Sequence, residues 1–441
     1  MVPWKLPAEL ASWVTRLAEM LDARVASRLA TILCGMLFAQ GRRTVASWLR
    51  AVGVGHAFPA YYYFLGSLGR KVDLVAGALL RLAVPVIAPG DRLLLAIDDT
   101  PTKRYGPKVQ GAGIHHNPTP GPADQKFLYG HIWVTLACLV RHPLWATIGL
   151  PLRALLYIRQ KDIAKLPRRT KLKFRTKLEM AAELIAWAAD RLHWLGKTLW
   201  IVVDGAYGKR PVLDQAKAKN VVVVSRLRKD ARLCNVPKPP RQRGPGRPRT
   251  YGAPLSLAKR GAHRRGWQTG TFTLYGETVT KTFKTFVATY RPAGGAIRVV
   301  IVKETNGWVA FFATDPEATV AQVLEAVADR AAIEQDFHDL KEVHGAGQQQ
   351  VRNYWANVAA YHLNLWLHTL IELWAWARPQ AELCDRRHSP WDDPERRPSH
   401  ADRRNALRRS CLEREFQAAQ AQHGVSRKLL TLFTGLLRLA G

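Results

Sequence analysis

The sequence predicts an α/β fold in which helices flank a mixed β-sheet, with a helical domain before the sheet and a mainly β subdomain inserted into it. Between residues 90 and 227, short apolar runs that end on acidic residues alternate with amphipathic stretches. The first 89 residues have helical periodicity, and segment 228–316 contains a series of short strand-like runs. With 441 residues, of which 47% are hydrophobic, the chain is long enough for a core of several parts.

The chain carries a large excess of positive charge. Its 66 lysines and arginines outnumber 34 aspartates and glutamates, which gives a formal net charge of +32. Such an excess predicts a polyanionic partner. Because the basic residues lie in many short groups and flank no apolar span, nucleic acid is favoured over a membrane surface.

The cysteines indicate a reducing compartment. There are five, widely spaced and without a C-x2-C pair, so neither a disulfide framework nor a common zinc module is predicted. Cys384, His388, His400 and Cys411 could in principle surround zinc, but their spacing matches no familiar pattern. Buried or idle thiols are the preferred interpretation.

Residues 1–89 are predicted to form a helical domain. The periodicity runs from about residue 7 to residue 88, and a basic turn at 41–44 precedes the apolar segment 45–49. A DNA-binding bundle and a plain helical cap on the next domain both fit this pattern, because no recognition-helix signature decides between them.

Segment 90–227 is predicted to form the first part of the sheet. Residues 93–97 are a continuous apolar run that ends on Asp98 and Asp99, and residues 198–203 are a second such run that ends on Asp204. Runs of this kind indicate buried central strands. Because central strands can lie side by side, this order can bring the acidic ends together. Further strands are expected at 131–140, 145–158 and 221–225, with helices at 171–193 and 210–218.

Segment 228–316 is too long for a simple loop and is predicted to be a β subdomain. It begins with a basic, proline-rich tract at 237–249 and continues with strands at 270–275, 281–288, 297–302 and 308–313. Within the tract, Arg247 and Arg249 belong to a Gly-Arg-Pro sequence like that of an AT-hook, which fits the narrow minor groove of DNA. A flexible basic linker that contacts phosphates without sequence preference is the alternative.

Arg330, Glu334 and Lys341 stand in the order R-x3-E-x6-K within a predicted helix at 319–343. At about 100° of rotation per residue, Glu334 lies about 40° and Lys341 about 20° from Arg330, so the three side chains share one stripe. A carboxylate between two cations suits a metal ion together with phosphates. An ordinary surface ladder of charges is the alternative interpretation.

The last third of the chain is predicted to be helical. Asp336 and Asp339 fall on the far side of the signature helix and are expected to be solvated. Residues 317–378 complete the α/β domain, and the polar stripe within 355–377 indicates a core-facing helix. The basic region 379–441 contains an arginine-rich run that could clamp DNA or form a solvated face.

Asp99, Asp204 and Glu334 form a candidate catalytic and metal-binding site. Two of them stand at strand ends, and the third is on a helix that can pack across those ends. Cleavage of phosphodiesters uses such clusters, because two divalent cations about 4 Å apart activate the attacking oxygen and stabilise the leaving one. Mg²⁺ prefers hard oxygen ligands, and Mn²⁺ is expected to substitute for it.

These features resemble the DDE transposases of bacterial insertion sequences, of the cut-and-paste type. In that family a β insertion interrupts an RNase H-like core, and the last acid lies in a Y-x2-R-x3-E-x6-K signature. The resemblance covers residues 93–376, with Val327 in place of the tyrosine. The first acid of the family precedes a threonine or similar residue, which implies Asp99 rather than Asp98.

The resemblance also implies DNA contacts. Arg330 and Lys341 would hold phosphates of the transposon ends. Trp308, in the last strand of the insertion, would stack on a base flipped out while a hairpin intermediate forms. Burial of Trp308 in the core of the subdomain is the alternative.

The resemblance implies a bacterial, cytoplasmic and nucleoid-associated transposase that acts as a homodimer on double-stranded DNA. It would nick the element's ends, form hairpins and join the freed ends to target DNA. Two alternatives remain open: an RNase H-like nuclease without strand transfer, and a transposase-derived protein that only binds DNA. The predicted parts are 1–89, 90–227, 228–316, 317–378 and 379–441.

Overall fold

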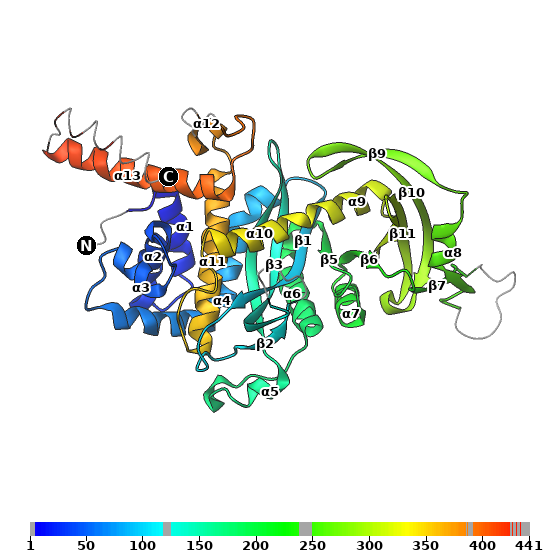
Figure 1. The fold of residues 1–441 in the computed structure, drawn as a ribbon, viewed down its shortest axis with the longest axis horizontal. Coiled ribbons are helices and arrows are strands. Elements are labelled where there is room, and N and C mark those ends of the chain that lie inside the picture. Colours follow the sequence, from blue (N-terminus) through cyan, green and yellow to red (C-terminus); the bar gives the residue numbers. More distant parts are fainter. Residues whose placement is uncertain are drawn as a thin grey trace.

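The protein is described here by a computed structural model that covers residues 5–117, 125–237, 249–384, 386, 391–423, 426, 429 and 433. Figure 1 shows a central sheet with a group of helices on one side and a strand-rich extension on the other. Among these residues, no helix is long and apolar enough to cross a membrane.

A mixed sheet of twelve strands forms the centre of the described structure. The strands are β1 (Arg92–Lys103), β2 (Gly113–His116), β3 (Phe127–His142), β4 (Ala146–Tyr157), β5 (Thr198–Val203), β6 (Val222–Leu227), β7 (Arg232–Cys234), β8 (Pro254–Ser256), β9 (Gln268–Leu274), β10 (Glu277–Tyr290), β11 (Gly295–Glu304) and β12 (Gly307–Ala313). Their order is β2-β3-β1-β5-β6-β12-β11-β10-β7-β8, with β4 beside β3 and β9 beside β10.

The helices lie at both ends of the chain and between the strands. They are α1 (Ala8–Ala18), α2 (Ala23–Phe38), α3 (Val45–Ala51), α4 (Phe58–Ile87), α5 (Gln160–Ile163), α6 (Lys177–Leu192), α7 (Arg210–Ala218), α8 (Leu257–Ala262), α9 (Val320–Asp329), α10 (Ala331–Glu342), α11 (Tyr354–Ala375), α12 (Gln380–Leu383) and α13 (His400–His423). Short 3-10 turns occur at Arg168–Thr170, His193–Leu195 and Arg291–Ala293.

The apolar runs that predicted central strands do form them. β1 and β5 pair in parallel from Arg92↔Thr198 to Ile97↔Val203, and β5 pairs in parallel with β6. On its other edge β1 pairs antiparallel with β3. These strands are covered on both faces, which is why their sequences are apolar without alternation.

The predicted strands of segment 228–316 are all present, but they extend the central sheet instead of forming a sheet of their own. β12 pairs antiparallel with β6, for example through Ala313↔Val224, and β11 and β10 follow it. The pairing satisfies the backbone groups along the edge of β6 that would otherwise be open. The candidate residues of this segment are therefore held in register with the core strands.

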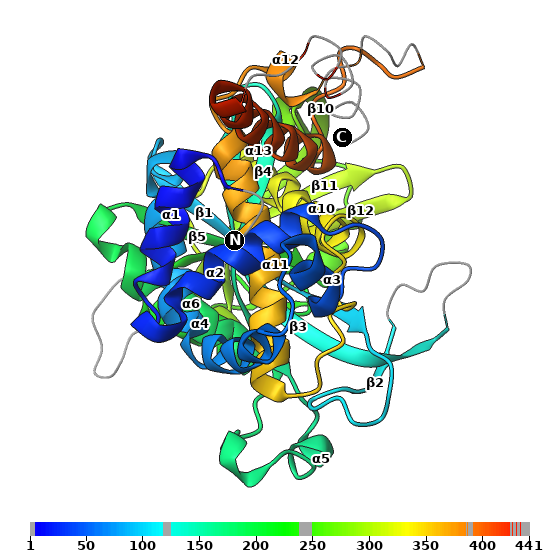
Figure 2. The same ribbon diagram turned by 90° about the vertical axis from the view of Figure 1, so that its left-hand side faces the viewer.

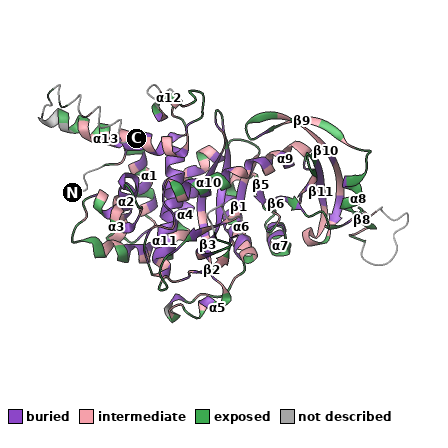
Figure 3. Ribbon diagram, viewed as in Figure 1, coloured by how far each residue is buried: buried purple, intermediate pink, exposed green. Residues whose placement is uncertain are grey.

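The N-terminal helices pack on the long helix α11. Figure 2, which faces this end of the molecule, shows α1 to α3 in front of α11. The closest approach is between α4 and α11, where a Cβ added to Gly69 would lie 1.9 Å from the carbonyl oxygen of Trp355. Helix α11 is buried along almost its whole length, as Figure 3 shows, so the prediction of a core-facing helix is confirmed.

The predicted helix at 319–343 is interrupted at Arg330, which separates α9 from α10. The prediction that Asp336 and Asp339 are solvated is wrong, because they are only 3% and 7% exposed. The helical rotation placed them correctly on the far side from Glu334. That side faces strand β4 and helix α11, so it is the packed side of the helix.

The arginine-rich run is not a solvated face throughout, since Arg403, Arg404 and Arg408 are buried. Arg404 donates a hydrogen bond of 2.8 Å to the carbonyl oxygen of Leu37, near the end of α2. A cation at the C-terminal end of a helix satisfies carbonyls that have no intrahelical partner. These three arginines therefore hold α13 to the protein and are not available to clamp DNA. The five cysteines are all free thiols.

The contact of α4 with α11 makes a prediction about stability. Gly69→Ala should lower the free energy of unfolding by about 1–3 kcal/mol, because its new methyl group meets the backbone of Trp355 and forces the helices apart. Gly66→Ala, in the same helix but with open space around its Cβ, is the matched control and should raise stability by about 0.5–1 kcal/mol. Urea denaturation measures both; equal effects of the two substitutions would contradict the packing argument.

Candidate active site

Asp98 and Asp204 stand next to each other where the parallel pairing of β1 with β5 ends. Asp204 follows the last residue of β5, whereas Asp98 lies within β1, which continues to Lys103. Ile97 and Val203 are the last pair of the β1–β5 ladder, and each aspartate is the following residue. Residues in register on parallel strands point to the same face of a sheet, and successive residues point to opposite faces. Asp98 is therefore on the face of Asp204, and Asp99 is on the other.

The turn after β5 fixes the backbone of Asp204. Its carbonyl oxygen accepts hydrogen bonds from the amide of Tyr207 at 2.9 Å and from Ser225 Oγ at 3.1 Å. Ser225 belongs to the neighbouring strand β6. The Asp204 side chain is left exposed to solvent, where a metal ion or a phosphate can reach it.

Arg330 joins the first strand to the signature helix. One guanidinium nitrogen contacts Asp98 Oδ2 at 2.7 Å, and the other contacts Glu334 Oε1 at 2.5 Å. The Asp98 side chain is 20% exposed, and that of Glu334 is 58% exposed. The structure thus brings the helix acid to the strand acid, with an arginine between the two carboxylates.

The electrostatics around Asp98 are those of a crowded anionic site. Burial raises the pKa of the Asp98 carboxyl to about 6. The negative charges of Asp99 and Asp204 act in the same direction, and Arg330 acts against them. The ionised form of a carboxyl group in this position is stabilised when a further cation binds, because attraction to the cation offsets both the cost of burial and the repulsion.

Asp99 has different partners. Its Oδ2 accepts a hydrogen bond of 2.6 Å from Lys177 Nζ, at the start of α6, and its Oδ1 accepts one of 2.5 Å from the Tyr207 hydroxyl. Burial and the neighbouring Asp99 charge raise the pKa of Tyr207, so this hydroxyl keeps its proton and donates it. Both carboxylate oxygens of Asp99 are therefore already hydrogen-bonded within the protein.

No pattern in the sequence singles out Lys177 or Tyr207. Lys177 begins α6, whose capping box of Thr176 and Glu179 is a recognisable helix start, but the helix start does not say which strand end it faces. The sequence does contain information for choosing between Asp98 and Asp99. One apolar run ends directly before Asp98 and the other ends directly before Asp204, so in-register pairing of the two runs also pairs these two aspartates.

The other predicted DNA contacts are dispersed. Lys341 is half-buried near the end of α10. Arg249, the last residue of the basic tract, is exposed. Arg247 lies outside the described residues.

Trp308 is half-buried in β12, at the rim of a hollow near Asp204. A Cβ on Gly261 would lie 2.3 Å from the indole, so α8 packs directly on the ring. Lys229 Nζ lies 5.1 Å from the ring centroid. The hollow has a volume of about 420 Å³, and its lining includes Gly205, the residue after Asp204, together with Arg226.

A family model described as DDE superfamily endonuclease matches residues 16–282, which is more than half of the chain. The chain belongs to the DDE superfamily endonucleases. It is therefore assigned to enzymes that act on nucleic acid and that generally use divalent metal ions. The matched range includes Asp98, Asp99 and Asp204 but ends before Glu334. A search of curated proteins found no match.

The raised pKa of Asp98 makes a prediction about stability and pH. The folded protein binds a proton at Asp98 that the unfolded chain has already released, so stability is lost as the pH rises through about 6. In metal-free protein at about pH 8, Asp98→Asn should therefore be more stable than wild type by up to about 2 kcal/mol.

Below the pKa of an unfolded aspartate, about pH 4, this difference should disappear because Asp98 is protonated in both states. Urea denaturation at several pH values measures it, with Asp214→Asn, an exposed aspartate on α7, as the control. A difference between wild type and Asp98→Asn that does not change with pH would contradict the burial of a charged Asp98.

Proposed function

We propose that this endonuclease is the transposase of a bacterial insertion sequence and that Asp98, Asp204 and Glu334 are its metal ligands. The observation that carries the proposal is that Arg330 joins a helix acid to Asp98 of β1, at the point where the parallel pairing of β1 with β5 ends. Arg330 contacts both Asp98 and Glu334, so the distance between these two carboxylates is spanned by a single guanidinium group.

The donor set fits divalent cations. All three ligands are carboxylates, which suit Mg²⁺ or Mn²⁺. Burial, and to a smaller extent the charges of Asp99 and Asp204, raise the pKa of Asp98, and a bound cation would offset both effects. When bound, two such cations supply activation of the attacking oxygen and stabilisation of the leaving oxygen. Asp98 on β1 and Asp204 after β5 would hold them, and Glu334 would close the site from α10.

Arg330 has a second role in this proposal. In the structure its guanidinium neutralises the two carboxylates. With cations bound to these carboxylates, the Arg330 guanidinium would be free to contact a phosphate of the DNA end, for which its planar fork is well suited. Lys341 would add charge along the same helix.

Asp99 would act as a positioning residue. Lys177 and Tyr207 hold its carboxylate on the face away from Glu334. Tyr207 stands three residues after Asp204, so its hydrogen bond ties the turn after β5 to the middle of β1. This contact fixes the spacing of Asp98 and Asp204 without placing Asp99 against the metal ions.

The hollow beside Trp308 supports strand transfer through a hairpin rather than simple nuclease activity. It offers an indole face next to cationic side chains and is adjacent to Asp204. An aromatic platform beside a cationic surface can hold a base that has left the double helix. A nuclease without strand transfer needs only the carboxylates. Joining of the ends also implies two copies of the chain on one pair of DNA ends.

The metal-ligand assignment predicts the effects of single substitutions. Asp98→Asn, Asp204→Asn and Glu334→Gln should each lower cleavage of end-containing DNA by about 100-fold or more while DNA binding persists. Asp99→Asn should cost about 10-fold, as expected for a residue that positions another. Gel assays with Mg²⁺ and labelled DNA measure nicks, hairpins and shifted bands. If the Asp98→Asn protein is fully active and the Asp99→Asn protein is inactive, the first metal ligand is Asp99 and not Asp98.

Trp308→Ala should leave the first nick nearly unchanged and slow hairpin formation about 5- to 100-fold, which corresponds to the loss of about 1–3 kcal/mol of base stacking. Trp267→Ala is the matched control, since Trp267 is also half-buried and lies against a lysine, with Lys284 Nζ 4.5 Å from its ring. Single-turnover kinetics separate the two steps. Folded Trp308→Ala protein with both rates unchanged would exclude the stacking role.

A further inference from the structure

Three buried histidines meet on the side of α10 that faces away from Glu334. His344 follows the end of α10, His368 is in α11, and His400 begins α13. One ring nitrogen from each lies within 4.8 Å of the others. Their exposures are 4%, 2% and 4%, so the cluster is closed to bulk water.

Two of the rings are oriented by carboxylates. His400 Nδ1 is 2.5 Å from Glu372 Oε1, and His368 Nε2 is 3.3 Å from Asp336 Oδ1. A carboxylate that accepts the proton of one ring nitrogen leaves the lone pair of the other available, as is usual for histidines that bind metals. The available atoms are Nε2 of His400 and Nδ1 of His368.

The His368 Nδ1 atom has no hydrogen-bond partner among the described residues, although it is fully buried. A buried polar atom without a partner costs about 1–3 kcal/mol. The ring cannot turn freely to find one, because it stacks on His400 with 3.9 Å between centroids and an interplanar angle of 14°. A buried ring nitrogen without a hydrogen-bond partner is therefore a candidate ligand atom for a bound group.

The third histidine completes the donor set. His344 Nε2 and His400 Nε2 are 2.7 Å apart, so in the structure one of them must carry a proton and donate it to the other. Two nitrogens bound to one tetrahedral zinc ion, with bonds of about 2.0 Å, stand about 3.3 Å apart. A small separation of these rings, with the His344 proton moved to Nδ1, makes room for an ion.

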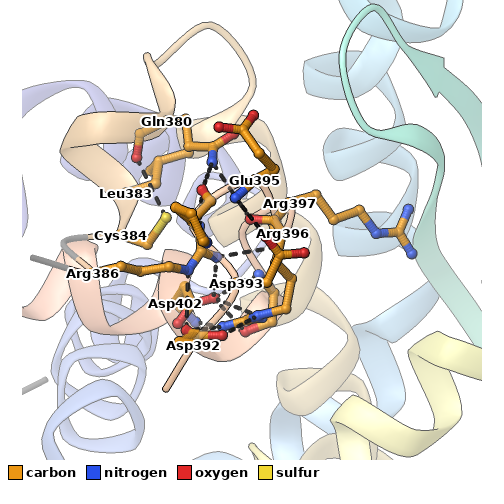
Figure 4. Close-up of polar contacts among 12 residues, drawn as sticks. Gln380, Leu383, Cys384, Arg386, Asp392, Asp393, Glu395, Arg396, Arg397 and Asp402 are labelled. Carbon is orange, nitrogen blue, oxygen red and sulfur yellow. Dashed lines mark hydrogen bonds and ion pairs between the residues drawn. The ribbon is translucent and has the colours of Figure 1, made fainter. Parts of the chain in front are cut away.

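A cavity of about 380 Å³ adjoins the cluster and supplies an open coordination position. His368, His400, Glu372 and Asp336 line it, and residues 396–399 form one wall. Figure 4 shows how this wall is held: Arg396 pairs with Asp392 and Asp402, and Arg397 extends away from that group to the carbonyl oxygen of Trp145. The cavity can hold water as a fourth ligand.

We propose that His344, His368 and His400 bind one first-row divalent cation, with Zn²⁺ as the best fit, at a site separate from the carboxylates of the active site. Imidazole nitrogens prefer zinc, nickel and copper to magnesium. The ion would tie together three segments, the end of α10, α11 and the start of α13, and would thereby fix the helix whose other face carries Glu334.

Metal analysis of the full-length chain without a histidine tag tests the proposal. After dialysis against Zn²⁺ and removal of excess, wild type should retain about one ion per chain, and the melting temperature should rise by several degrees relative to chelator-treated protein. With Co²⁺ in place of zinc, visible absorption bands of a low-symmetry nitrogen site should appear. Chelator-treated wild type that remains folded but neither binds Zn²⁺ nor acquires these bands would overturn the proposal.

Substitutions locate the ion. His344→Gln and His368→Gln should lose the bound zinc and its stabilising effect. His338→Gln, on the exposed face of α10, should retain both. Glu334→Gln should also retain them, which separates this site from the proposed Mg²⁺ site. Folded His344→Gln and His368→Gln proteins with unchanged zinc content would overturn the assignment. The wild-type Co²⁺ spectrum decides the case if both variants fail to fold.

Discussion

The carboxylates of Asp98 and Glu334 lie close together in this protein, although their charges repel one another. Arg330 offsets this repulsion by contacting Asp98 on β1 and Glu334 on α10 at once. This bridge links α10 to β1 on the side of Glu334, while the opposite side of α10 packs on β4 and α11. An arginine is suited to this place because its charge persists when it is partly buried.

Helix α10 carries acids on two faces with opposite environments. Glu334 is exposed near the strand ends, whereas Asp336 and Asp339 are buried against the sheet and α11. Burial raises the pKa of Asp336 to about 6, against the favourable contact with His368. Farther along α11, Glu372 pairs with Arg403 and His400, and these partners hold its pKa below the ordinary value despite burial. Buried charges are tolerated here because each has a partner, and removal of one partner would leave the other uncompensated.

The continuous sheet connects the proposed chemistry to the proposed DNA contacts. Strand β12 pairs with β6, and β6 pairs with β5, whose end carries Asp204. Trp308 therefore has a fixed position relative to Asp204, with only hydrogen-bonded strands between them. A separately packed β subdomain could rotate against the active site, whereas strands in one ladder cannot. This rigidity suits a site that would have to hold a flipped base and a phosphate at a constant separation.

The sequence alone predicted nine of the twelve described strands, most of the helices and the acidic residues of the proposed site, but not the short strands β2, β7 and β8. It could do so because apolar runs and helical periodicity are local patterns, and residues close in sequence set them. It also placed Asp336 and Asp339 on the correct side of their helix. Three features follow from the packing of the elements and are decided only by the tertiary structure. This side of the helix is buried, Asp98 rather than Asp99 faces Glu334, and His344, His368 and His400 meet. Each of these outcomes depends on which elements pack together, and Asp98 and Arg330 are separated by 232 positions in the chain. Local patterns carry no information about partners at such distances.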